Sequence, residues 1–318
     1  MDFKSTVKVA VIQASPIPFN KEDTTYKAVR LMEEASKEGA KILLFPEAFI
    51  PAYPRGLAFG IGRGSRSNEG RKLWQLYWEN SLEIPGREAD LIAEVSGDLK
   101  VYVAIGAIER VSGYRSGTLY CSILYFSPQG RFLGRHRKVR ATGIERLIWA
   151  EGDGSTLTVI QTEYGRVGGL ICWENYMPLA RTALYGKGVE IYLAPTADSR
   201  DTWISTLVHI ACEGRCFVLG CNQFVKKDMF PRDLPGIGDL DSLPDIICRG
   251  GSAIISPFGS IIKGPLYNKE GILYAKLNLS DIIMAKLDFD PVGHYSRPDI
   301  FQLKVDETEK RVVFNIMK

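Results

Sequence analysis

The residue best suited to nucleophilic chemistry in this chain is Cys172. It follows a short apolar run with glycines, residues 165–171, which is typical of a buried strand. Pro178 then opens a helical pattern, and proline is favourable in a first helical turn because its missing N–H costs nothing there. Cys172 is therefore expected on a sharp strand-to-helix turn at the carboxyl end of a strand, the edge at which open α/β sheets place their chemistry. A thiol near a helix N-terminus can attack as a thiolate.

The alternative for Cys172 is a buried structural thiol, which is the commoner environment of a cysteine. The polar pair Glu174–Asn175 directly after it argues against that alternative. The other cysteines are Cys121, Cys212, Cys216, Cys221 and Cys248; none forms a C-x-x-C pair, and their density is low for a disulfide framework. Cys212, Cys216 and Cys221 lie close together in the sequence, but they lack the paired spacing of a zinc site and are expected to be reduced core thiols.

A cysteine nucleophile usually works with a histidine, and the chain offers His136, His209 and His294. His209 lies on a polar helix face four residues before Glu213, a spacing that suits a solvated surface pair. His294 lies in the C-terminal tail. His136 is the best placed, but it belongs to a basic cluster over residues 134–140, and such a cluster is usually a solvated face.

The acidic residue Glu47 points to a lysine of that basic cluster instead. Apolar residues enclose Glu47 on both sides in the sequence, and a carboxylate in such a setting is costly unless it is paired. Lys138 is a candidate partner, and the same cation would also activate Cys172. A second carboxylate, Glu145, follows seven residues after Lys138. It is either half of a local salt bridge with Arg146 or an acid/base group that holds the lysine and water in place.

Three segments carry a resemblance to a known family. Phe45–Ala48, His136–Lys138 and Cys172–Asn175 look like the signature segments of the carbon–nitrogen hydrolase superfamily, and the closer match is to its nitrilase branch. Three motifs in this order and at this spacing are specific, and the resemblance extends over nearly the whole chain. It implies that Glu47 is the general base, Lys138 the catalytic lysine, Cys172 the nucleophile and Glu145 a second glutamate.

The resemblance further implies hydrolysis of a small-molecule organic nitrile to the carboxylic acid and ammonia through a thioimidate and a thioester on Cys172. No metal and no organic cofactor is required. Lys138 and the backbone N–H of Trp173 would stabilise the developing charge. Tyr53, Trp173 and Asn175 are expected to form walls of the substrate pocket. The chain departs from its relatives at Ala141 and Tyr176, and Tyr176 could change the pocket.

Other functions remain open at this point. An amidase of the same superfamily would act on a small amide with the same residues, and nitrile hydratase or cyanide-converting activity belongs to the same branch. A cofactor-binding α/β protein is a different class, but the glycines within residues 60–65 lack the third glycine of the dinucleotide fingerprint and do not follow a strand. A third class is a binding protein that keeps the hydrolase fold but has lost the catalytic activity. The complete set of Glu47, Lys138 and Cys172 argues against it.

The elements that must position these residues form two similar βαβ patterns. A strand over residues 7–14, a helix over 23–38 and a strand over 39–46 make the first pattern. The segment that ends at Cys172, a helix over 178–185 and a strand over 188–195 make the second. Glu47 and Thr196 are equivalent in this comparison, since each follows a strand-ending proline. The fold implied by the resemblance, a four-layer αββα sandwich of class α/β, agrees with two such layers packed face to face.

The rest of the chain contributes further elements to one domain. Helices are expected over residues 71–80, 87–97, 202–213 and 280–289, and strands over 101–109, 118–127, 131–137, 217–221, 252–256 and 272–277. The Pro- and Gly-rich loop over 226–249 is long enough for a lid or a subunit contact. Because no linker divides the chain, residues 1–318 are predicted to be a single carbon–nitrogen hydrolase domain. Its tail, about 290–318, is expected to contain a terminal β-like run and to take part in subunit contacts.

Composition limits the partners. A net charge of +3 over 318 residues gives no reason to expect nucleic acid or a membrane surface as a partner. The longest apolar run, residues 101–108, is too short to span a bilayer, and no secretory signal precedes the first strand. The cytoplasm is therefore the expected location. The resemblance implies a homo-oligomer, either a dimer or a larger assembly.

Overall fold

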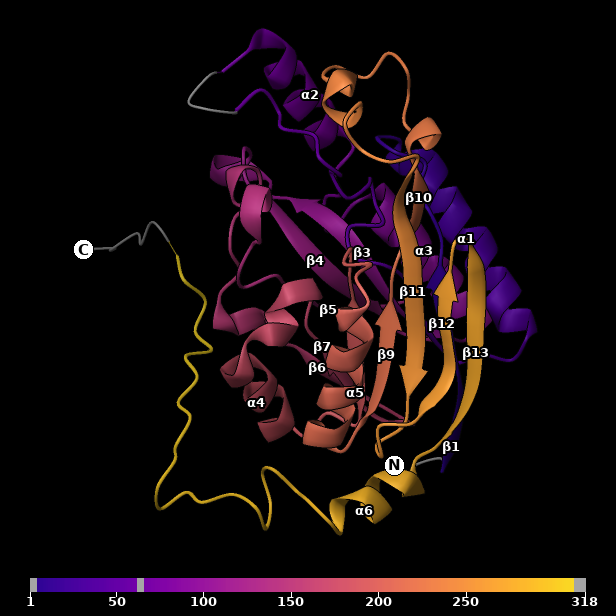
Figure 1. Cartoon of the computed structure of the whole chain (residues 1–318), viewed down its shortest axis with the longest axis vertical. Helices are drawn as coiled ribbons and strands as arrows, with labels where there is room; N and C mark the ends of the chain where they lie inside the picture. The colour runs from indigo at the N-terminus through magenta and orange to yellow at the C-terminus, as the bar shows by residue number, and fades with distance from the viewer. Residues whose placement is uncertain (1–4, 62–65, 312–318) are drawn as a thin grey trace.

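Two β-sheets form the centre of the molecule in the computed structural model, which describes residues 5–61 and 66–311 (Figure 1). The first sheet has the order β13-β1-β2-β3-β4-β5. Its strands are β1 (Thr6–Gln13), β2 (Ile42–Leu44), β3 (Tyr102–Arg110), β4 (Leu119–Phe126), β5 (Phe132–Arg137) and β13 (Gly271–Asn278). The second sheet has the order β10-β11-β9-β8-β7-β6, with β12 beside β11. Its strands are β6 (Val159–Thr162), β7 (Gly165–Gly169), β8 (Ile191–Pro195), β9 (Phe217–Cys221), β10 (Phe224–Lys226), β11 (Ile246–Ile255) and β12 (Ile261–Tyr267).

Both βαβ units predicted from the sequence are present. In the first, α1 (Lys21–Lys37) connects β1 to β2, and the two strands pair in parallel with Val9 opposite Ile42. In the second, α4 (Pro178–Gly186) connects β7 to β8, which pair in parallel with Val167 opposite Ile191. The other helices are α2 (Asn68–Glu79), α3 (Arg87–Leu99), α5 (Thr202–Gly214) and α6 (Ser280–Lys286).

The strands are apolar on both faces because each sheet is covered on both sides. Alternate side chains of β1 pack in different layers: Val9 lies between the sheets, whereas Ala10 lies under α1 and α3. The same alternation on β8 places Leu193 between the sheets and Tyr192 under α4 and α5. The layers are therefore helix, sheet, sheet, helix, and the predicted αββα sandwich is confirmed.

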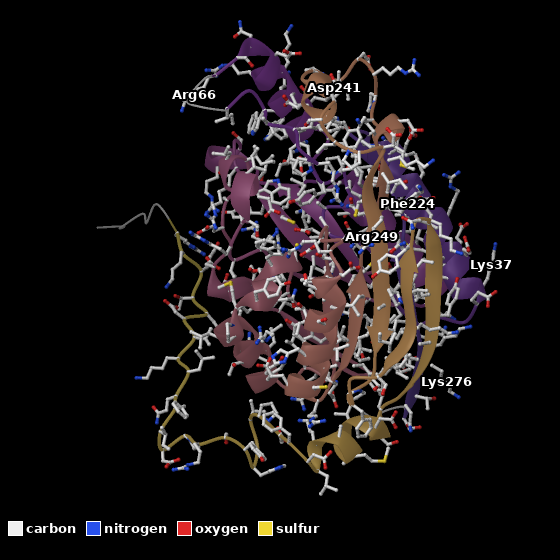
Figure 2. All side chains as sticks on the ribbon, in the orientation of Figure 1. Lys37, Arg66, Phe224, Asp241, Arg249 and Lys276 are labelled. Atoms are coloured by element: carbon white, nitrogen blue, oxygen red, sulfur yellow. The ribbon has the colours of Figure 1, made fainter. Side chains whose placement is uncertain are left out.

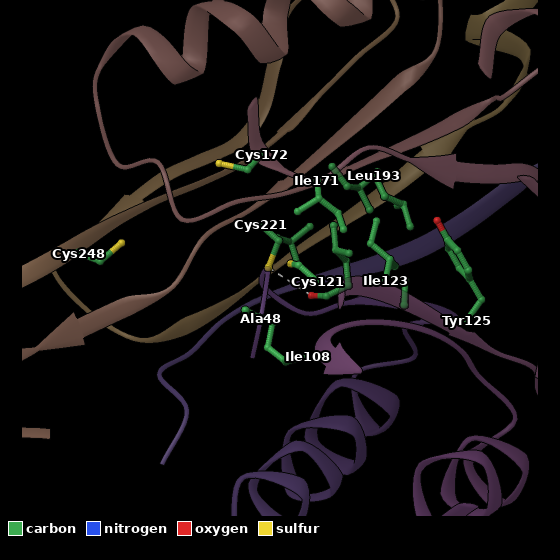
Figure 3. Close-up of a cluster of buried hydrophobic side chains, with 14 of the residues drawn as sticks. Ala48, Ile108, Cys121, Ile123, Tyr125, Ile171, Cys172, Leu193, Cys221 and Cys248 are labelled. Carbon is green, nitrogen blue, oxygen red and sulfur yellow. Dashed lines mark hydrogen bonds between the residues drawn. The ribbon is translucent and has the colours of Figure 1, made fainter. Parts of the chain in front are cut away.

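Apolar side chains from the two sheets meet in the central layer. Ile123 and Tyr125 of β4 lie close to Leu193 of β8 and to Ile171, which follows β7 (Figure 3). Charged side chains such as Lys37 and Lys276 project from the outside of the molecule (Figure 2). The packing of apolar side chains between the two sheets fixes the sheets against each other, so residues at their edges have defined relative positions.

Some elements differ from the sequence prediction. Strands β6, β10 and β12 were not expected, and β12 lacks a clear apolar alternation because most of it is exposed. The predicted loop over 226–249 is partly regular, since it contains two short 3₁₀ turns and the first residues of β11. No helix in the described part of the chain is long and apolar enough to cross a bilayer.

The C-terminal tail runs along the surface without a helix or strand over residues 290–311 (Figure 1). Polar contacts attach its described part to the domain: for example, Glu307 pairs with Lys187 at 3.0 Å, and the Lys310 N–H donates to Asp153 Oδ2 at 2.7 Å. The terminal β-like run predicted for this tail has no counterpart over residues 290–311, and residues 312–318 lie outside the described residues. The same holds for residues 62–65 of the glycine-containing segment considered as a cofactor loop.

Candidate active site

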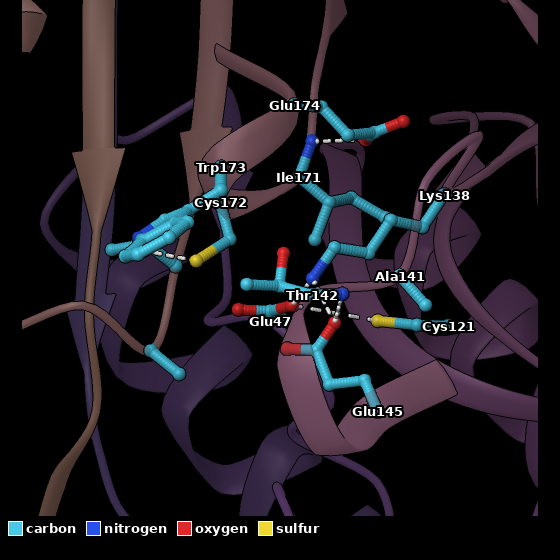
Figure 4. A network of polar contacts seen from close by, with 12 residues as sticks. Glu47, Cys121, Lys138, Ala141, Thr142, Glu145, Ile171, Cys172, Trp173 and Glu174 are labelled. Carbon is cyan, nitrogen blue, oxygen red and sulfur yellow. Dashed lines mark hydrogen bonds and ion pairs between the residues drawn. The ribbon is translucent and has the colours of Figure 1, made fainter. Parts of the chain in front are cut away.

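The four residues predicted to carry the chemistry meet at one edge of the two sheets (Figure 4). Glu47 follows β2, and Lys138 follows β5. Because β3 to β4 and β4 to β5 are both antiparallel steps, β5 runs in the same direction as β2, and both residues leave the sheet at the same edge. Glu145 lies in the 3₁₀ turn Gly143–Leu147, and Cys172 begins the 3₁₀ turn Cys172–Tyr176 after β7.

The Lys138 ammonium is held between the two carboxylates. Its Nζ lies 2.7 Å from Glu47 Oε1 and 2.7 Å from Glu145 Oε2, and all three side chains are buried. Glu145 is fixed further by the Tyr53 hydroxyl, which donates to Oε1 at 2.6 Å, and by the Thr142 N–H, which donates to Oε2 at 2.7 Å. The lysine partner proposed for Glu47 from the sequence is therefore present, and Glu145 pairs with the same lysine.

Burial and charge set the protonation states of this cluster. Burial raises the pKa of Glu47 above its ordinary value; the Lys138 ammonium opposes this rise, and the negative charge of Glu145 adds to it. For Lys138, burial works against the charged form, but the surrounding negative charges, Glu47 first among them, together outweigh burial and hold the pKa well above the usual range. Lys138 is therefore cationic at neutral pH, as its proposed role requires.

The Cys172 sulfur occupies a constrained position. Its backbone lies in the left-handed region with φ 52°, which is uncommon for a non-glycine residue and typical of a strained functional turn. The Thr196 hydroxyl contacts Sγ at 3.1 Å. Burial raises the pKa of the Cys172 thiol to about 12, and the negative charge of Glu47 adds to the rise, while Lys138 lowers it. The thiol is therefore protonated at rest, and it must lose its proton to a base before it can attack as a thiolate.

Glu47 has one carboxylate oxygen available for a proton. Oε1 accepts from Lys138, whereas Oε2 is buried and has no hydrogen-bond partner among the described residues. The Cys172 thiol lies close enough to lower the pKa of Glu47. A base with an open acceptor beside a protonated thiol is the arrangement that nucleophilic catalysis requires.

The predicted pocket residues fall into different environments. Trp173 is 40 % exposed, and its indole N–H donates to Asp198 Oδ2 at 2.9 Å. Tyr176, the residue that departs from the family pattern, stands edge-to-face against Trp173 with ring centroids 5.9 Å apart. Tyr53 contacts Glu145 directly, as described above. Trp173 and Tyr176 thus belong to the turn that carries Cys172, whereas Tyr53 approaches the site from the Glu145 side.

Asn175 requires a correction as a pocket wall. It is fully buried, and its amide Nδ2 donates to the carbonyl oxygens of Leu170 and Cys172 at 2.9 and 2.8 Å. Its Oδ1 accepts from the Tyr192 hydroxyl at 2.8 Å. The side chain therefore stabilises the nucleophile turn from within the protein.

Glu174 and His136 form a connection that sequence reasoning missed. Glu174 accepts from the backbone N–H of Ile171 at 2.7 Å and from that of Val139 at 2.5 Å. These two residues are the immediate neighbours of Cys172 and Lys138. His136 Nε2 contacts Glu174 Oε2 at 2.9 Å, and its Nδ1 contacts the Thr156 carbonyl at 2.9 Å. His136 is thus buried, although it belongs to a basic cluster of the kind that usually forms a solvated face.

A second connection supports Glu47. The Gln223 amide donates to the Glu47 carbonyl at 2.6 Å and accepts from the Arg55 guanidinium at 3.2 Å. Arg55 also donates to the Ala197 carbonyl at 2.9 Å, next to Thr196. No local sequence pattern indicated this link, because its members lie far apart in the chain.

Comparison with known proteins identifies a family and several similar sequences. Residues 8–286 match the carbon–nitrogen hydrolase family. Nitrilase 3 of Arabidopsis thaliana is 49% identical over 317 residues, covering 98% of this chain and 90% of that protein. The bifunctional nitrilase/nitrile hydratase NIT4B of Nicotiana tabacum is 49% identical over 94% of this chain and 86% of its own. The aliphatic nitrilase of Sinorhizobium fredii (strain HH103) is 48% identical over 96% and 97%.

Solved structures share the fold at low sequence identity. The carbon-nitrogen hydrolase from Helicobacter pylori G27 superposes with a TM-score of 0.72 at 18% identity, covering 93% of this chain and 97% of that one. Nit3 from Saccharomyces cerevisiae superposes with a TM-score of 0.66 at 20% identity, covering 93% and 98%. The chain therefore belongs to the carbon–nitrogen hydrolase family. Within that family, its relatives at about half identity place it in the nitrilase branch.

Proposed function

We propose that this protein hydrolyses an organic nitrile to the carboxylic acid and ammonia, with Cys172 as the nucleophile. The observation that carries the proposal is the meeting of Cys172, Glu47 and Lys138 in one buried site, although they come from three distant segments. Relatives named nitrilase at 48–49% identity support the choice of nitriles as substrates.

The first half of the reaction forms the bond to sulfur. Glu47 accepts the Cys172 proton through its open Oε2 while Sγ attacks the nitrile carbon. One π bond of the nitrile breaks, the nitrogen takes up a proton, and a thioimidate results. The Lys138 ammonium and the Trp173 backbone N–H stabilise the negative charge that develops on the nitrogen.

The second half releases the two products. Water adds to the thioimidate carbon, the nitrogen leaves as ammonia, and a thioester remains on Cys172. A second water, activated by Glu47, displaces the sulfur and gives the carboxylic acid. Glu145 keeps Lys138 in place throughout, since its Oε2 lies 2.7 Å from the ammonium. No metal or organic cofactor takes part.

Two related outcomes use the same site. An amidase would bind a small amide, and its tetrahedral intermediate would need the same base, lysine and nucleophile. If the amide were released after water adds to the thioimidate, the enzyme would also act as a nitrile hydratase. A relative with 49% identity is named as a bifunctional enzyme of this kind. The nitrilase reaction is favoured because relatives with that name cover almost the whole chain.

Ammonia release from a matched nitrile and amide separates these outcomes. A panel of aliphatic, arylacetic and cyano-amino-acid nitriles is incubated with the wild type and with Cys172→Ala and Lys138→Ala. We expect ammonia and acid from at least one nitrile, more slowly or not at all from its amide. Cys172→Ala should abolish turnover with an unchanged circular dichroism spectrum, and Lys138→Ala should reduce it by about 10²–10³-fold or more. Full activity in either variant would rule out the assignment.

We also propose the assembly and location of the protein. The tail over residues 290–311 leaves Ile300 and Phe301 55% and 76% exposed, which supports a role in contacts within a dimer or larger homo-oligomer. All six cysteines are unpaired thiols, which supports a reducing compartment, the cytoplasm.

A further inference from the structure

Thr196 lies at the same sheet edge as Cys172 without having been assigned a role. It follows Pro195, the last residue of β8, and β8 pairs in parallel with β7, the strand before Cys172. Thr196 is fully buried, and its backbone N–H donates to the Cys221 carbonyl at 2.8 Å. Its position corresponds to that of Glu47, which follows a strand-ending proline in the other βαβ unit.

The hydrogen bonds of the Thr196 hydroxyl determine its direction. Its Oγ1 accepts the backbone N–H of Asp198 at 2.9 Å and lies 3.1 Å from Cys172 Sγ. A hydroxyl group carries one hydrogen and two lone pairs. Because the backbone N–H can only donate, it occupies a lone pair, and the hydroxyl hydrogen remains for the sulfur. The contact therefore has the geometry of an O–H donor aimed at the nucleophilic atom.

We propose that Thr196 is a further catalytic residue, whose hydroxyl donates a hydrogen bond to the Cys172 sulfur and stabilises the negative charge that develops there. The inference rests on the proposed function, in which Glu47 removes the thiol proton. As the proton passes from Sγ to Glu47 Oε2, the electron pair of the S–H bond stays on sulfur. A hydrogen bond to such a charge is stronger than one to the neutral thiol, so it favours the reactive form.

The surroundings of the sulfur make this donor valuable. Glu47 after β2 raises the pKa of Cys172, and burial raises it more. Lys138 after β5 opposes these effects, as do the Thr196 hydroxyl and the backbone N–H of Ala197. The side chains of Tyr53 and Arg200 also interact electrostatically with the Cys172 sulfur. The ammonium of Lys138 is also paired with the carboxylates of Glu47 and Glu145. The Thr196 hydroxyl and the Ala197 N–H are neutral hydrogen-bond donors, and their stabilisation of the sulfur is not divided in that way.

The test measures the reactivity of Cys172 without substrate. Iodoacetamide alkylation of Cys172 is followed by peptide mass spectrometry at a fixed, mildly alkaline pH in the wild type, Thr196→Val and Thr196→Ser. Valine keeps the shape of threonine and removes the hydroxyl, whereas serine keeps the hydroxyl. We expect Thr196→Val to slow alkylation by about 10- to 100-fold, the effect of losing a hydrogen bond to a charged group. Thr196→Ser should react at close to the wild-type rate.

Thr162→Val is the matched control. Thr162 is equally buried, accepts the N–H two residues ahead from Tyr164 at 3.0 Å, and donates to the Gly165 carbonyl at 2.7 Å. Thr162, which lies on β6, thus has the same hydrogen-bond pattern as Thr196, except that its hydroxyl donates to a carbonyl oxygen where that of Thr196 contacts the sulfur. This variant should alkylate at the wild-type rate, because no reactive atom depends on its hydroxyl.

The outcomes separate a chemical role from a structural one. A merely structural Thr196 would loosen its loop when replaced, so that Thr196→Val would alkylate at the wild-type rate or faster; that result overturns the inference. If Thr196→Val fails to fold, slow alkylation of folded Thr196→Ser would overturn it as well, since serine retains the donor. Absence of any labelling of Cys172 in the wild type would instead contradict the proposed nucleophile, and the inference would fall with it.

Discussion

At the scale of single residues, the site concentrates charge on three side chains that are buried in the protein. Lys138 lies between Glu47 and Glu145, and all three side chains are about 1% exposed or less. Such a buried cluster is weak support for stability, because the cost of removing charges from water offsets their attraction. Its effect is on reactivity instead: the raised pKa of Glu47 makes it a stronger base than an ordinary carboxylate.

The pH dependence of turnover tests this view of Glu47. The base must be ionised, so kcat/KM should fall as the pH drops through the raised pKa of Glu47, at a midpoint above its ordinary value of 4.5. Because the negative charge of Glu145 contributes to that rise, Glu145→Gln should move the acid limb of the profile to lower pH. The measurement is kcat/KM for a nitrile from acid to neutral pH. An acid limb that stays in place or moves upward in Glu145→Gln would contradict the account.

At the scale of secondary-structure elements, Glu174 connects the two segments that carry the nucleophile and the lysine. Its carboxylate accepts the N–H groups of Ile171 and Val139 and contacts His136. His136 Nδ1 lies against a carbonyl oxygen, so it carries a proton, and a second proton is shared between Nε2 and Glu174. Burial lowers the pKa of His136, but the adjacent Glu174 carboxylate and the Thr156 carbonyl together more than compensate, and the pKa is raised.

The loss of stability caused by replacing His136 should depend on pH. Since the pKa of His136 is raised in the folded state, its contribution is fully present below about pH 6.5 and is lost as pH rises through the folded value. We expect His136→Gln to lower the free energy of unfolding by about 3–5 kcal/mol at mildly acidic pH and by less at alkaline pH. Denaturant titrations at both pH values measure the difference.

His209→Gln is the control for that experiment. His209 is 64% exposed in its side chain and lies 3.8 Å from Glu213 on the same helix, which is the surface pair predicted from the sequence. An exposed pair of this kind contributes little, so its replacement should change stability only slightly at either pH. Equal destabilisation by His136→Gln at acid and alkaline pH would argue against a charged His136–Glu174 pair.

The elements explain which features could be predicted from sequence. The βαβ units were predictable because their strands are apolar on both faces and their helices have one apolar side. Glu47 was predictable because its own neighbours are apolar, so its charge needed a distant partner. Thr196 and Glu174 were not, because a hydroxyl and a carboxylate in a short turn are usually solvated, and only tertiary packing brings them to Cys172 and Lys138. Strand β12 escaped prediction because its exposed face lacks an apolar pattern.

At the scale of the whole molecule, apolar side chains remain uncovered near the chain end. Leu287 at the end of α6 is 82% exposed, and Phe301 in the tail is 76% exposed. The tail is attached to the domain mainly through polar contacts at Glu307 and Lys310. Large apolar side chains at the surface of a protein often mark a contact with another subunit.

Sedimentation velocity tests the proposed assembly. The wild type should sediment as a dimer or a larger species, and Phe301→Asp should shift the distribution toward smaller species, because a charge at a buried apolar contact is costly. Lys304→Ala, at an exposed charged position of the same tail, should leave the distribution unchanged. A wild type that sediments only as a monomer would contradict the proposal.

The covalent intermediate on Cys172 tests the central claim most directly. The wild type is mixed with a nitrile that it turns over, quenched in acid during the steady state, and digested for peptide mass spectrometry. We predict that the peptide containing Cys172 gains the mass of the nitrile in the thioimidate, or of the nitrile plus water minus ammonia in the thioester. Turnover without any adduct, or an adduct on a different cysteine such as Cys121, would contradict the account.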